Sequence, residues 1–140
     1  MIVDSSAVVA IIMDESDADA LSDCLLAASG ARMAAPTYVE VSIVCDQRPT
    51  LVAADLDEVL EAHAVSVAAF TPEQAQVART AYQRYGRGSG HPASLNFGDC
   101  FSYAMAIVAN EPLLFTGDDF THTDVRNALA EAEAQSEPTA

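Results

Sequence analysis

Acidic residues that could bind a metal ion stand at four separate places in the sequence, each beside an apolar segment. Asp4 ends the opening "MIVD", and the pair Asp118 and Asp119 follows "LLFTG". Glu40 and Asp99 stand near the starts of two segments with helical spacing of apolar residues. Carboxylate oxygens without histidine or cysteine suit Mg²⁺ or Mn²⁺ better than zinc. If the fold brings these residues together, they can form a site for a hard divalent cation.

Each of these acidic residues also has an ordinary structural explanation. Asp4 could cap the helix that follows it, and Thr37 with Glu40 matches the spacing of a capping box. Asp99 could complement the dipole of a helix capped by Asn96, and "GDD" is a common turn sequence. Taken singly, these explanations are preferable. Together they weaken, because two unit charges ~4 Å apart repel by on the order of 4 kcal/mol at an effective dielectric near 20. A divalent cation would remove that repulsion.

The order of the expected elements explains why these residues should meet. Apolar runs predict strands at 1–4, 31–36, 65–70 and 113–117. Between and around them, apolar periodicity predicts helices at 5–15, 16–29 (capped by Ser16), 37–47, 51–64, 71–86 (capped by Thr71) and from 97 onward. Strands that alternate with helices favour an α/β domain with a mainly parallel sheet. Sites in such a sheet form beyond the carboxyl ends of the strands, where all four acidic positions are expected.

Charge restricts the possible functions. The 140-residue chain has a formal net charge of −15, six basic residues that are all arginine, and no lysine. Such a chain repels nucleic acid over most of its surface, so a simple nucleic-acid-binding module is disfavoured and direct DNA binding is not expected. An acidic enzyme can still act on a polyanion if metal ions and local arginines supply attraction.

Half of the positive charge lies in one segment, at Arg79, Arg84 and Arg87. These arginines could contact phosphates at the rim of a site, or they could simply complete a solvated helix end. The sequence does not favour either explanation.

Targeting signals and disulfide patterns are not expected. The longest apolar run, 7–13, is far shorter than the ~20 residues that a membrane span requires, and no basic segment precedes it. Cys24, Cys45 and Cys100 are odd in number and form no CxxC pair. They are therefore expected to be free thiols in a reducing cytoplasm.

Four segments in order, "MIVDSSAVVAII", "PTYVEVSIV", "LNFGDCFSYAMA" and "PLLFTGDDF", resemble the signature segments of PIN-domain ribonucleases, most closely the VapC-type toxins of bacterial toxin–antitoxin pairs. The resemblance implies a PIN-like three-layer α/β/α sandwich over residues 1–125. The polar segment at 126–140 is expected to be a helical or disordered tail, with its last ten residues frayed or disordered. It also implies Mg²⁺-dependent (or Mn²⁺-dependent) cleavage of RNA that leaves a 5′-phosphate and a 3′-hydroxyl.

The resemblance assigns roles to particular residues. Asp4, Glu40 and Asp99 match three acidic positions of the family, and Asp119 matches the fourth, although Asp118 could substitute. Asp4 and Asp99 are then the main metal ligands, while Glu40 and Asp119 complete the shell or orient the attacking water. Three further residues match polar positions around the metal site: Ser6, Asn96 and Thr116.

The resemblance also implies partners. Together with the apolar stripes over 37–63, it predicts a homodimer that binds a small VapB-type antitoxin. A basic antitoxin segment that enters the acidic cleft would fit the net charge of −15.

Two other functions stay open from the sequence. A receiver-like or haloacid-dehalogenase-like phosphoryl-transfer domain also gathers aspartates beyond parallel strands, but such domains generally place a lysine there. A PIN-like fold could also serve as a non-catalytic partner-binding module that excludes RNA by its charge.

Overall fold

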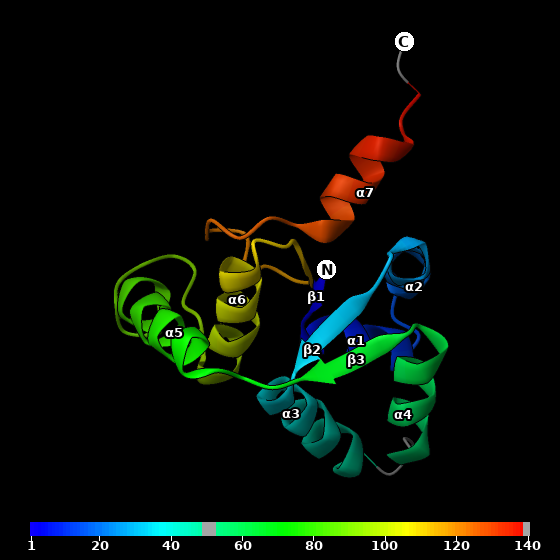
Figure 1. Cartoon of the computed structure of the whole chain (residues 1–140), viewed down its shortest axis with the longest axis horizontal. Helices are drawn as coiled ribbons and strands as arrows, with labels where there is room; N and C mark the ends of the chain where they lie inside the picture. Colours follow the sequence, from blue (N-terminus) through cyan, green and yellow to red (C-terminus); the bar gives the residue numbers. More distant parts are fainter. Residues whose placement is uncertain (49–52, 139–140) are drawn as a thin grey trace.

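The described residues, 1–48 and 53–138 of a computed structural model, contain one sheet of four parallel strands in the order β3-β2-β1-β4. Figure 1 shows how seven helices surround it. The strands are β1 (Ile2–Val3), β2 (Ala31–Ala34), β3 (Val65–Ala68) and β4 (Leu113–Leu114). The helices are α1 (Ser5–Ile12), α2 (Ala18–Ala27), α3 (Ala35–Asp46), α4 (Ala53–Ala62), α5 (Pro72–Tyr85), α6 (Phe97–Ala109) and α7 (Ala128–Ser136).

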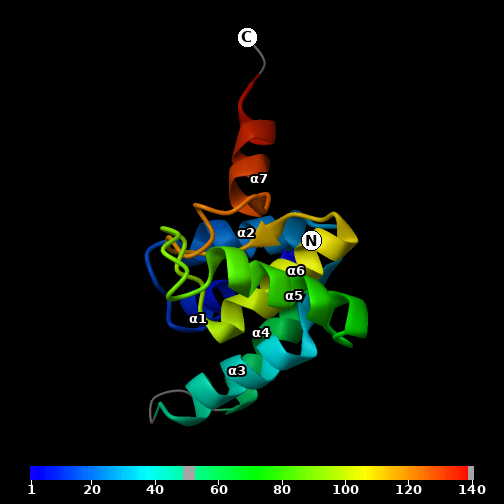
Figure 2. The same cartoon turned by 90° about the vertical axis from the view of Figure 1, so that its left-hand side faces the viewer.

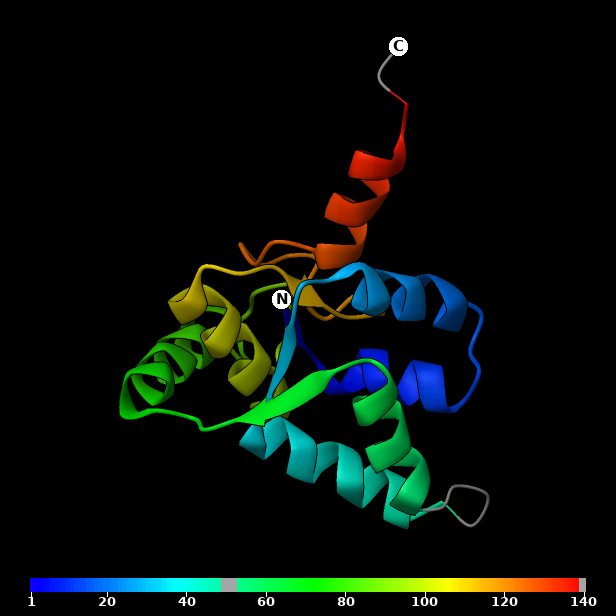
Figure 3. The same cartoon turned by 45° about the vertical axis from the view of Figure 1, so that its right-hand side comes forward.

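Consecutive residues of β1 and β4 enter two different hydrophobic cores, because neighbouring side chains in a strand point to opposite faces. Ile2 and Leu113 pack on the face covered by α5 and α6. Val3 and Leu114 pack on the face covered by α1, α2, α3 and α4. Figure 3 shows the sheet between these two groups of helices. The predicted three-layer α/β/α fold with a parallel sheet is confirmed.

Some predicted element ends were wrong for identifiable reasons. Helix α3 begins at Ala35, so Pro36 lies in its first turn, where the missing N–H of proline costs no hydrogen bond. Thr37 is therefore a buried helix residue and not an N-cap. Helix α2 has Asp17, not Ser16, at its N-cap position. The predicted strand 113–117 is paired only at Leu113–Leu114.

Other local predictions hold. Thr71 and Gln74 form the capping box of α5, with Pro72 in the first turn. The helix predicted from residue 51 is described from Ala53 onward, and its first two residues lie outside the described part. All three cysteines are free and buried. No helix in the described part of the chain is long and apolar enough to cross a membrane.

Residues 128–136 are more ordered than the sequence indicated. Residues 131–136, expected to be frayed, belong to α7, whose N-cap Asn127 accepts a hydrogen bond from the Ala130 N–H. Ala128 is buried against the core that contains α2, and Leu129 packs beside it. Figure 2 shows α7 projecting from the domain, although Ala132 still packs against this core.

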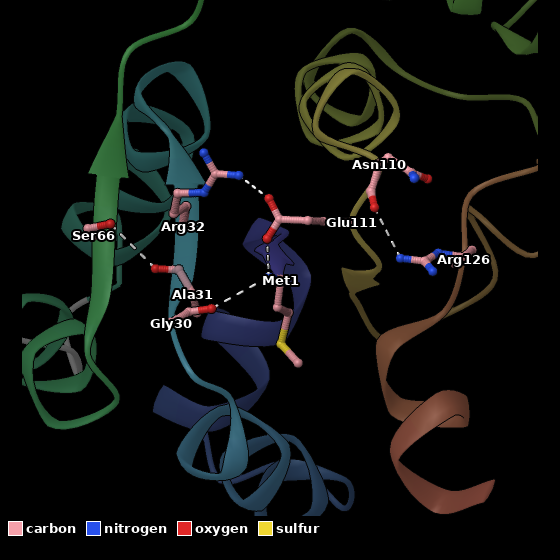
Figure 4. Close-up of polar contacts among 8 residues, drawn as sticks. All are labelled: Met1, Gly30, Ala31, Arg32, Ser66, Asn110, Glu111 and Arg126. Atoms are coloured by element: carbon pink, nitrogen blue, oxygen red, sulfur yellow. Dashed lines mark hydrogen bonds and ion pairs between the residues drawn. The ribbon is translucent and has the colours of Figure 1, made fainter. Parts of the chain in front are cut away.

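Basic groups pair with acids at the amino ends of the strands, shown in Figure 4. Glu111, just before β4, forms ion pairs with Arg32 on β2 and with the amino group of Met1. Hydrogen bonding to that amino group is the main reason why the pKa of Glu111 is lowered. On the same edge, Arg126 donates to the Asn110 carbonyl. The candidate site lies at the opposite edge of the sheet. In the described part of the chain, its acidic residues form no such ion pairs with basic groups.

Candidate functional site

All four strands are parallel, but the side of the sheet to which the chain adds successive strands changes between β1 and β4. From β1 the chain continues to β2 and β3 on one side, and it returns to β4 on the other side. In open α/β sheets, ligands bind beyond the carboxyl ends of the strands at such a reversal. Asp4 directly follows β1, and its backbone N–H donates to the Leu114 carbonyl at 2.9 Å. The segment after β4 therefore lies beside Asp4.

Asp4 is held by hydrogen bonds at both oxygens and is only 3% exposed. It is the N-cap of α1, and its Oδ2 accepts a hydrogen bond from the Ser6 N–H at 3.0 Å. Its Oδ1 accepts from the Ser102 hydroxyl on α6 at 2.6 Å. Capping thus explains one oxygen, while the other joins α1 to α6.

Asp99 forms the capping box that the sequence indicated. The Asn96 N–H donates to Asp99 Oδ2 at 2.8 Å, and the Asp99 N–H donates to Asn96 Oδ1 at 2.9 Å. The carboxyl group is nevertheless buried, with the residue 7% exposed. Burial is the largest reason why its pKa rises from 3.8 to about 7, and the charges of Asp4, Asp119 and Glu40 raise it further against the opposing Asn96 hydrogen bond. A capping role alone does not explain why three other carboxylates lie near this one.

Glu40 does not form a capping box with Thr37, so that structural explanation was wrong. Its Oε1 accepts a hydrogen bond from the Ser5 hydroxyl at 3.0 Å. Burial and the charge of Asp4 raise the pKa of Glu40, while the Ser5 hydrogen bond lowers it. This acidic group therefore faces α1 and not the start of its own helix.

Gly98 makes room for the Glu40 carboxylate against the first turn of α6. A Cβ at position 98 would lie 2.1 Å from Glu40 Oε2, which is far inside van der Waals contact. Sequence reasoning missed this role, as it missed the contacts of Ser5 and Ser102. Both serines lie close in sequence to candidate residues, but their partners are distant in the chain, and nothing in the spacing identifies those partners.

The two aspartates after β4 are exposed and lie in a turn. Gly117, with φ at +85°, makes this turn in a conformation that glycine adopts without strain. Asp119 is the member of the pair whose charge raises the pKa of Asp99. Thr116 precedes the turn, and its N–H donates to Ser6 Oγ at 3.2 Å. Ser6, Asn96 and Thr116 thus all make hydrogen bonds around the carboxylates.

The donor set suits a hard cation, although it does not form a closed cage. Within residues 1–48 and 53–138, no three histidine, cysteine or acidic side chains are placed so that they could hold one metal ion together. Mg²⁺ commonly binds through one or two carboxylates and keeps several waters. None of the four candidate positions forms an ion pair in the same described part. Asp4 and Asp99 could therefore hold a cation whose other ligands are water or a phosphate.

The three arginines do not form one surface. Arg79 lines a groove of about 520 Å³ together with Tyr82 and Phe97. Arg84 lines a different groove, and its guanidinium lies over the Tyr85 ring at 4.7 Å from the centroid. Arg87 is exposed after the end of α5. The groove lined by Arg79 reaches the start of α6 at Phe97, and the Arg87 N–H donates to the Leu95 carbonyl just before α6.

A third groove, of about 630 Å³, adjoins the candidate site because both Glu40 and Asn96 line it. Its other walls are apolar and unusually exposed: Val39 is 54% exposed, Ile43 is 50% and Phe97 is 76%. We call these three residues the apolar face. Exposed apolar patches of this kind often mark a surface that binds a partner or a ligand.

The family model named PIN domain matches residues 1–126. The chain belongs to the PIN-domain family. Among PIN-domain relatives it is 52% identical, over 92% of its length and 98% of the relative, to Ribonuclease VapC28 of Mycobacterium tuberculosis. It is 44% identical to Ribonuclease VapC of Mycolicibacterium smegmatis, over 89% of this chain and 97% of that one. The predicted VapC-type resemblance is confirmed, and the receiver-like or dehalogenase-like alternative was wrong.

Two solved structures share the PIN-domain fold. The crystal structure of Mycobacterium tuberculosis VapC20, a sarcin-ricin loop cleaving toxin, superposes with a TM-score of 0.64 at 14% identity, covering 89% of this chain and 98% of that one. A toxin-antitoxin complex from Klebsiella pneumoniae gives a TM-score of 0.64 at 13% identity, covering 88% and 92%. At these identities the likeness concerns the fold.

Proposed function

We propose that the chain is a VapC-type toxin: an endoribonuclease that hydrolyses phosphodiester bonds of RNA with the help of a divalent metal ion, Mg²⁺ or Mn²⁺. Relatives that are named VapC ribonucleases and match nearly the whole chain support the reaction class. One structural observation carries the choice of site: the carboxylates of Asp4 and Asp99 are both buried at the carboxyl ends of the strands. Burial, and then the charges of Asp4, Asp119 and Glu40, raise the pKa of Asp99, so a cation there would relieve their repulsion.

Asp4 and Asp99 are the proposed metal ligands. Both are buried, and hydrogen bonds from Ser6, Ser102 and Asn96 fix their carboxylates before any cation binds. When bound, the cation makes a coordinated water more acidic and offsets negative charge that builds on the phosphate. Asp99 must lose its proton to act as a ligand, so cation binding should strengthen as the pH rises through about 7.

Glu40 and Asp119 are proposed to complete the site. Ser5 orients the Glu40 carboxylate, and burial raises the pKa of Glu40, which makes it a better proton acceptor for the attacking water. Asp119 is exposed and can reach a water or a cation from the solvent side. Asp118 remains the substitute if Asp119 does not act. No nucleophilic side chain is required.

The decisive experiment measures cleavage of structured and unstructured RNAs with EDTA, with Mg²⁺ and with Mn²⁺. Cleavage should require the metal and should fall at least about 100-fold in Asp4→Asn and in Asp99→Asn. Asp23→Asn is the matched control, because Asp23 is an exposed aspartate on α2 away from the site. Cleavage that persists in EDTA, or an Asp99→Asn enzyme as active as Asp23→Asn, would refute the proposed site.

The same assay separates the proposal from a non-catalytic role. If the wild type binds Mg²⁺ but cleaves no RNA under any condition, the chain is a partner-binding module that retains the fold.

Three buried thiols, among them Cys100 with its pKa raised to about 11 by burial, fit the reducing cytoplasm that we propose as its location.

We further propose a homodimer that binds a small VapB-type antitoxin, with residues 1–125 as the nuclease domain and the segment from 126 as an appended tail. The apolar face supports a protein partner, because Val39, Ile43 and Phe97 would bury their side chains only on association. A basic antitoxin segment would match the charge of −15. Light scattering tests the dimer, which a monomer at micromolar concentration would disprove. Copurification with the product of a neighbouring small gene tests the antitoxin.

A further inference from the structure

Asp17 stands at the N-cap position of α2 but does not cap it. Its side chain makes no capping hydrogen bond. By contrast, Asp4, Thr71, Asn96 and Asn127 all accept hydrogen bonds from the first turns of their helices. Asp17 Oδ2 instead accepts a hydrogen bond from the hydroxyl of Thr116, 99 residues away in the chain. The Asp17 carboxylate therefore makes a tertiary contact instead of capping its own helix.

That contact continues to the candidate site through a chain of hydrogen bonds. The Thr116 hydroxyl donates to Asp17, and the Thr116 N–H donates to Ser6 Oγ. The Ser6 N–H in turn donates to Asp4 Oδ2. Thr116 is thereby held at both its side chain and its backbone, immediately before the turn at Gly117 that carries Asp119.

We infer that Asp17 is a positioning residue for the cation site: it fixes Thr116, and through Thr116 it holds Ser6 and the turn that carries Asp119 in place. This inference rests on the proposed function. A hydrogen bond to a carboxylate is roughly twice as strong as one between neutral groups, so Asp17 restrains Thr116 better than a neutral acceptor would. Threonine has a single hydroxyl proton, and here it is donated to Asp17.

Two substitutions at Asp17 separate positioning from charge. Asp17→Ala removes the acceptor, whereas Asp17→Asn keeps an oxygen that can accept from Thr116. Asp17→Ala should weaken Mg²⁺ binding, measured by calorimetry and by the Mg²⁺-induced rise in Tm, by about tenfold, as expected for a residue that orients ligands. It should lower kcat while KM for RNA changes less than about twofold. Asp17→Asn should recover most of both losses.

A double-mutant cycle tests whether Asp17 acts through Thr116. Thr116→Val should reproduce the loss seen in Asp17→Ala, and combining the two should add little, because both remove the same hydrogen bond. Asn127→Ala is the control for helix capping: it removes the cap of α7, so it should lower Tm without changing Mg²⁺ affinity. If Asp17→Ala is too unstable to study, Asp17→Asn and Thr116→Val still give the comparison.

The outcomes distinguish a failure of the proposed role of Asp17 from a failure of the proposed function. Wild-type Mg²⁺ affinity and kcat in Asp17→Ala, or fully additive losses in the double variant, would overturn the role of Asp17 while leaving the proposed function intact. A wild type that neither binds Mg²⁺ nor cleaves RNA would overturn the proposed function, and the role of Asp17 with it.

Discussion

At Asp99 a helix cap and a charged site use the same carboxyl group, and this has a measurable effect on stability. The folded-state pKa is raised from 3.8 to about 7, so the protonated form favours the folded state. The resulting stability is present below about pH 4 and is lost as the pH rises through about 7. Metal-free protein should therefore become less stable across this range, and a divalent cation should restore stability because it binds the folded state.

Asp99→Asn should stabilise the metal-free protein at neutral pH, because the amide oxygen can still accept from Asn96 without carrying a charge. The expected gain is on the order of 1–2 kcal/mol, and each kcal/mol raises Tm by about 4 °C in a domain of this size. The variant should lose most of the Mg²⁺-induced rise. Thermal melts in EDTA and in Mg²⁺ at pH 5 and pH 7.5 measure both effects. A simple cap predicts the reverse, with a lower Tm in EDTA and no Mg²⁺ response in the wild type.

Gly98→Ala should separate stability from activity. The new Cβ would displace the flexible Glu40 carboxylate, while the helical backbone at position 98 tolerates alanine. Folding should be unchanged or improved by up to about 1 kcal/mol, but RNA cleavage should fall. In a Glu40→Ala background the same substitution should cost no further activity. An additional loss there would show that Gly98 acts on something other than Glu40.

Among the elements, the segment after β4 is packed against α5 and α6 through Phe115 and Phe120, and Asp124 adds hydrogen bonds to both helices. Asp124 accepts hydrogen bonds from the Tyr103 hydroxyl at 2.5 Å and from the Tyr85 hydroxyl at 3.3 Å. Burial and Asp124 both raise the pKa of Tyr103, which keeps the phenol protonated as a donor. The segment that carries Asp119 is therefore fixed at both ends, by Thr116 and by Asp124.

Tyr103→Phe should destabilise the protein by about 1 kcal/mol, the usual net value of one such hydrogen bond, and should increase proteolysis between 116 and 127. Denaturant unfolding and limited proteolysis measure the two effects. Tyr82→Phe is the matched control, because Tyr82 lies on α5 with an exposed ring. Equal behaviour of the two variants would mean that Asp124 does not hold the segment.

Sequence patterns predicted which elements exist better than where they end. Alternating strands and helices identified the parallel sheet, and the capping signals at Thr71 and Asn96 placed two helices correctly. The start of α3 was missed because Thr37 matched a cap, although Pro36 is itself a signal of a first turn. Phe115 after Leu114 extended the predicted fourth strand, because an apolar residue alone does not reveal where strand pairing stops.

The candidate site was predictable where a residue adjoins a strand or helix end and was not predictable where its role depends on a distant partner. The position of Asp4 after β1 follows from local order. The hydrogen bonds of Ser102 to Asp4 and of Thr116 to Asp17 join residues 98 and 99 positions apart. Side-chain hydroxyls carry no periodic signal, so only the folded chain identifies such pairs.

At the scale of the whole molecule, the chain is strongly acidic, yet its positive groups do not neutralise the proposed site. Arg32 and the amino group of Met1 pair with Glu111 at the opposite edge of the sheet. RNA must therefore approach an edge that repels it, and few arginines are available to assist.

Replacing Arg79, Arg84 and Arg87 together with glutamine should weaken RNA cleavage and flatten its salt dependence, while Mg²⁺ affinity stays nearly unchanged. Arg79→Gln alone should account for most of the effect, because Arg79 lines the groove that includes Phe97, whereas Arg84 stacks on Tyr85. Cleavage rates at several salt concentrations provide the measurement. Unaltered rates at every concentration would assign the cluster to a solvated helix end.

The strand order also sets when a newly made chain can become harmful. β1 is synthesised before the other strands, but its neighbour β4 begins only at residue 113, and Asp119 follows it. A nascent chain that has been synthesised only as far as residue 112 contains Asp4, Glu40 and Asp99. It lacks β4 and the turn that carries Asp119. The edge on which cleavage would depend is completed only once β4 and Asp119 have been made, so shorter products of interrupted synthesis should be harmless to the cell that makes them.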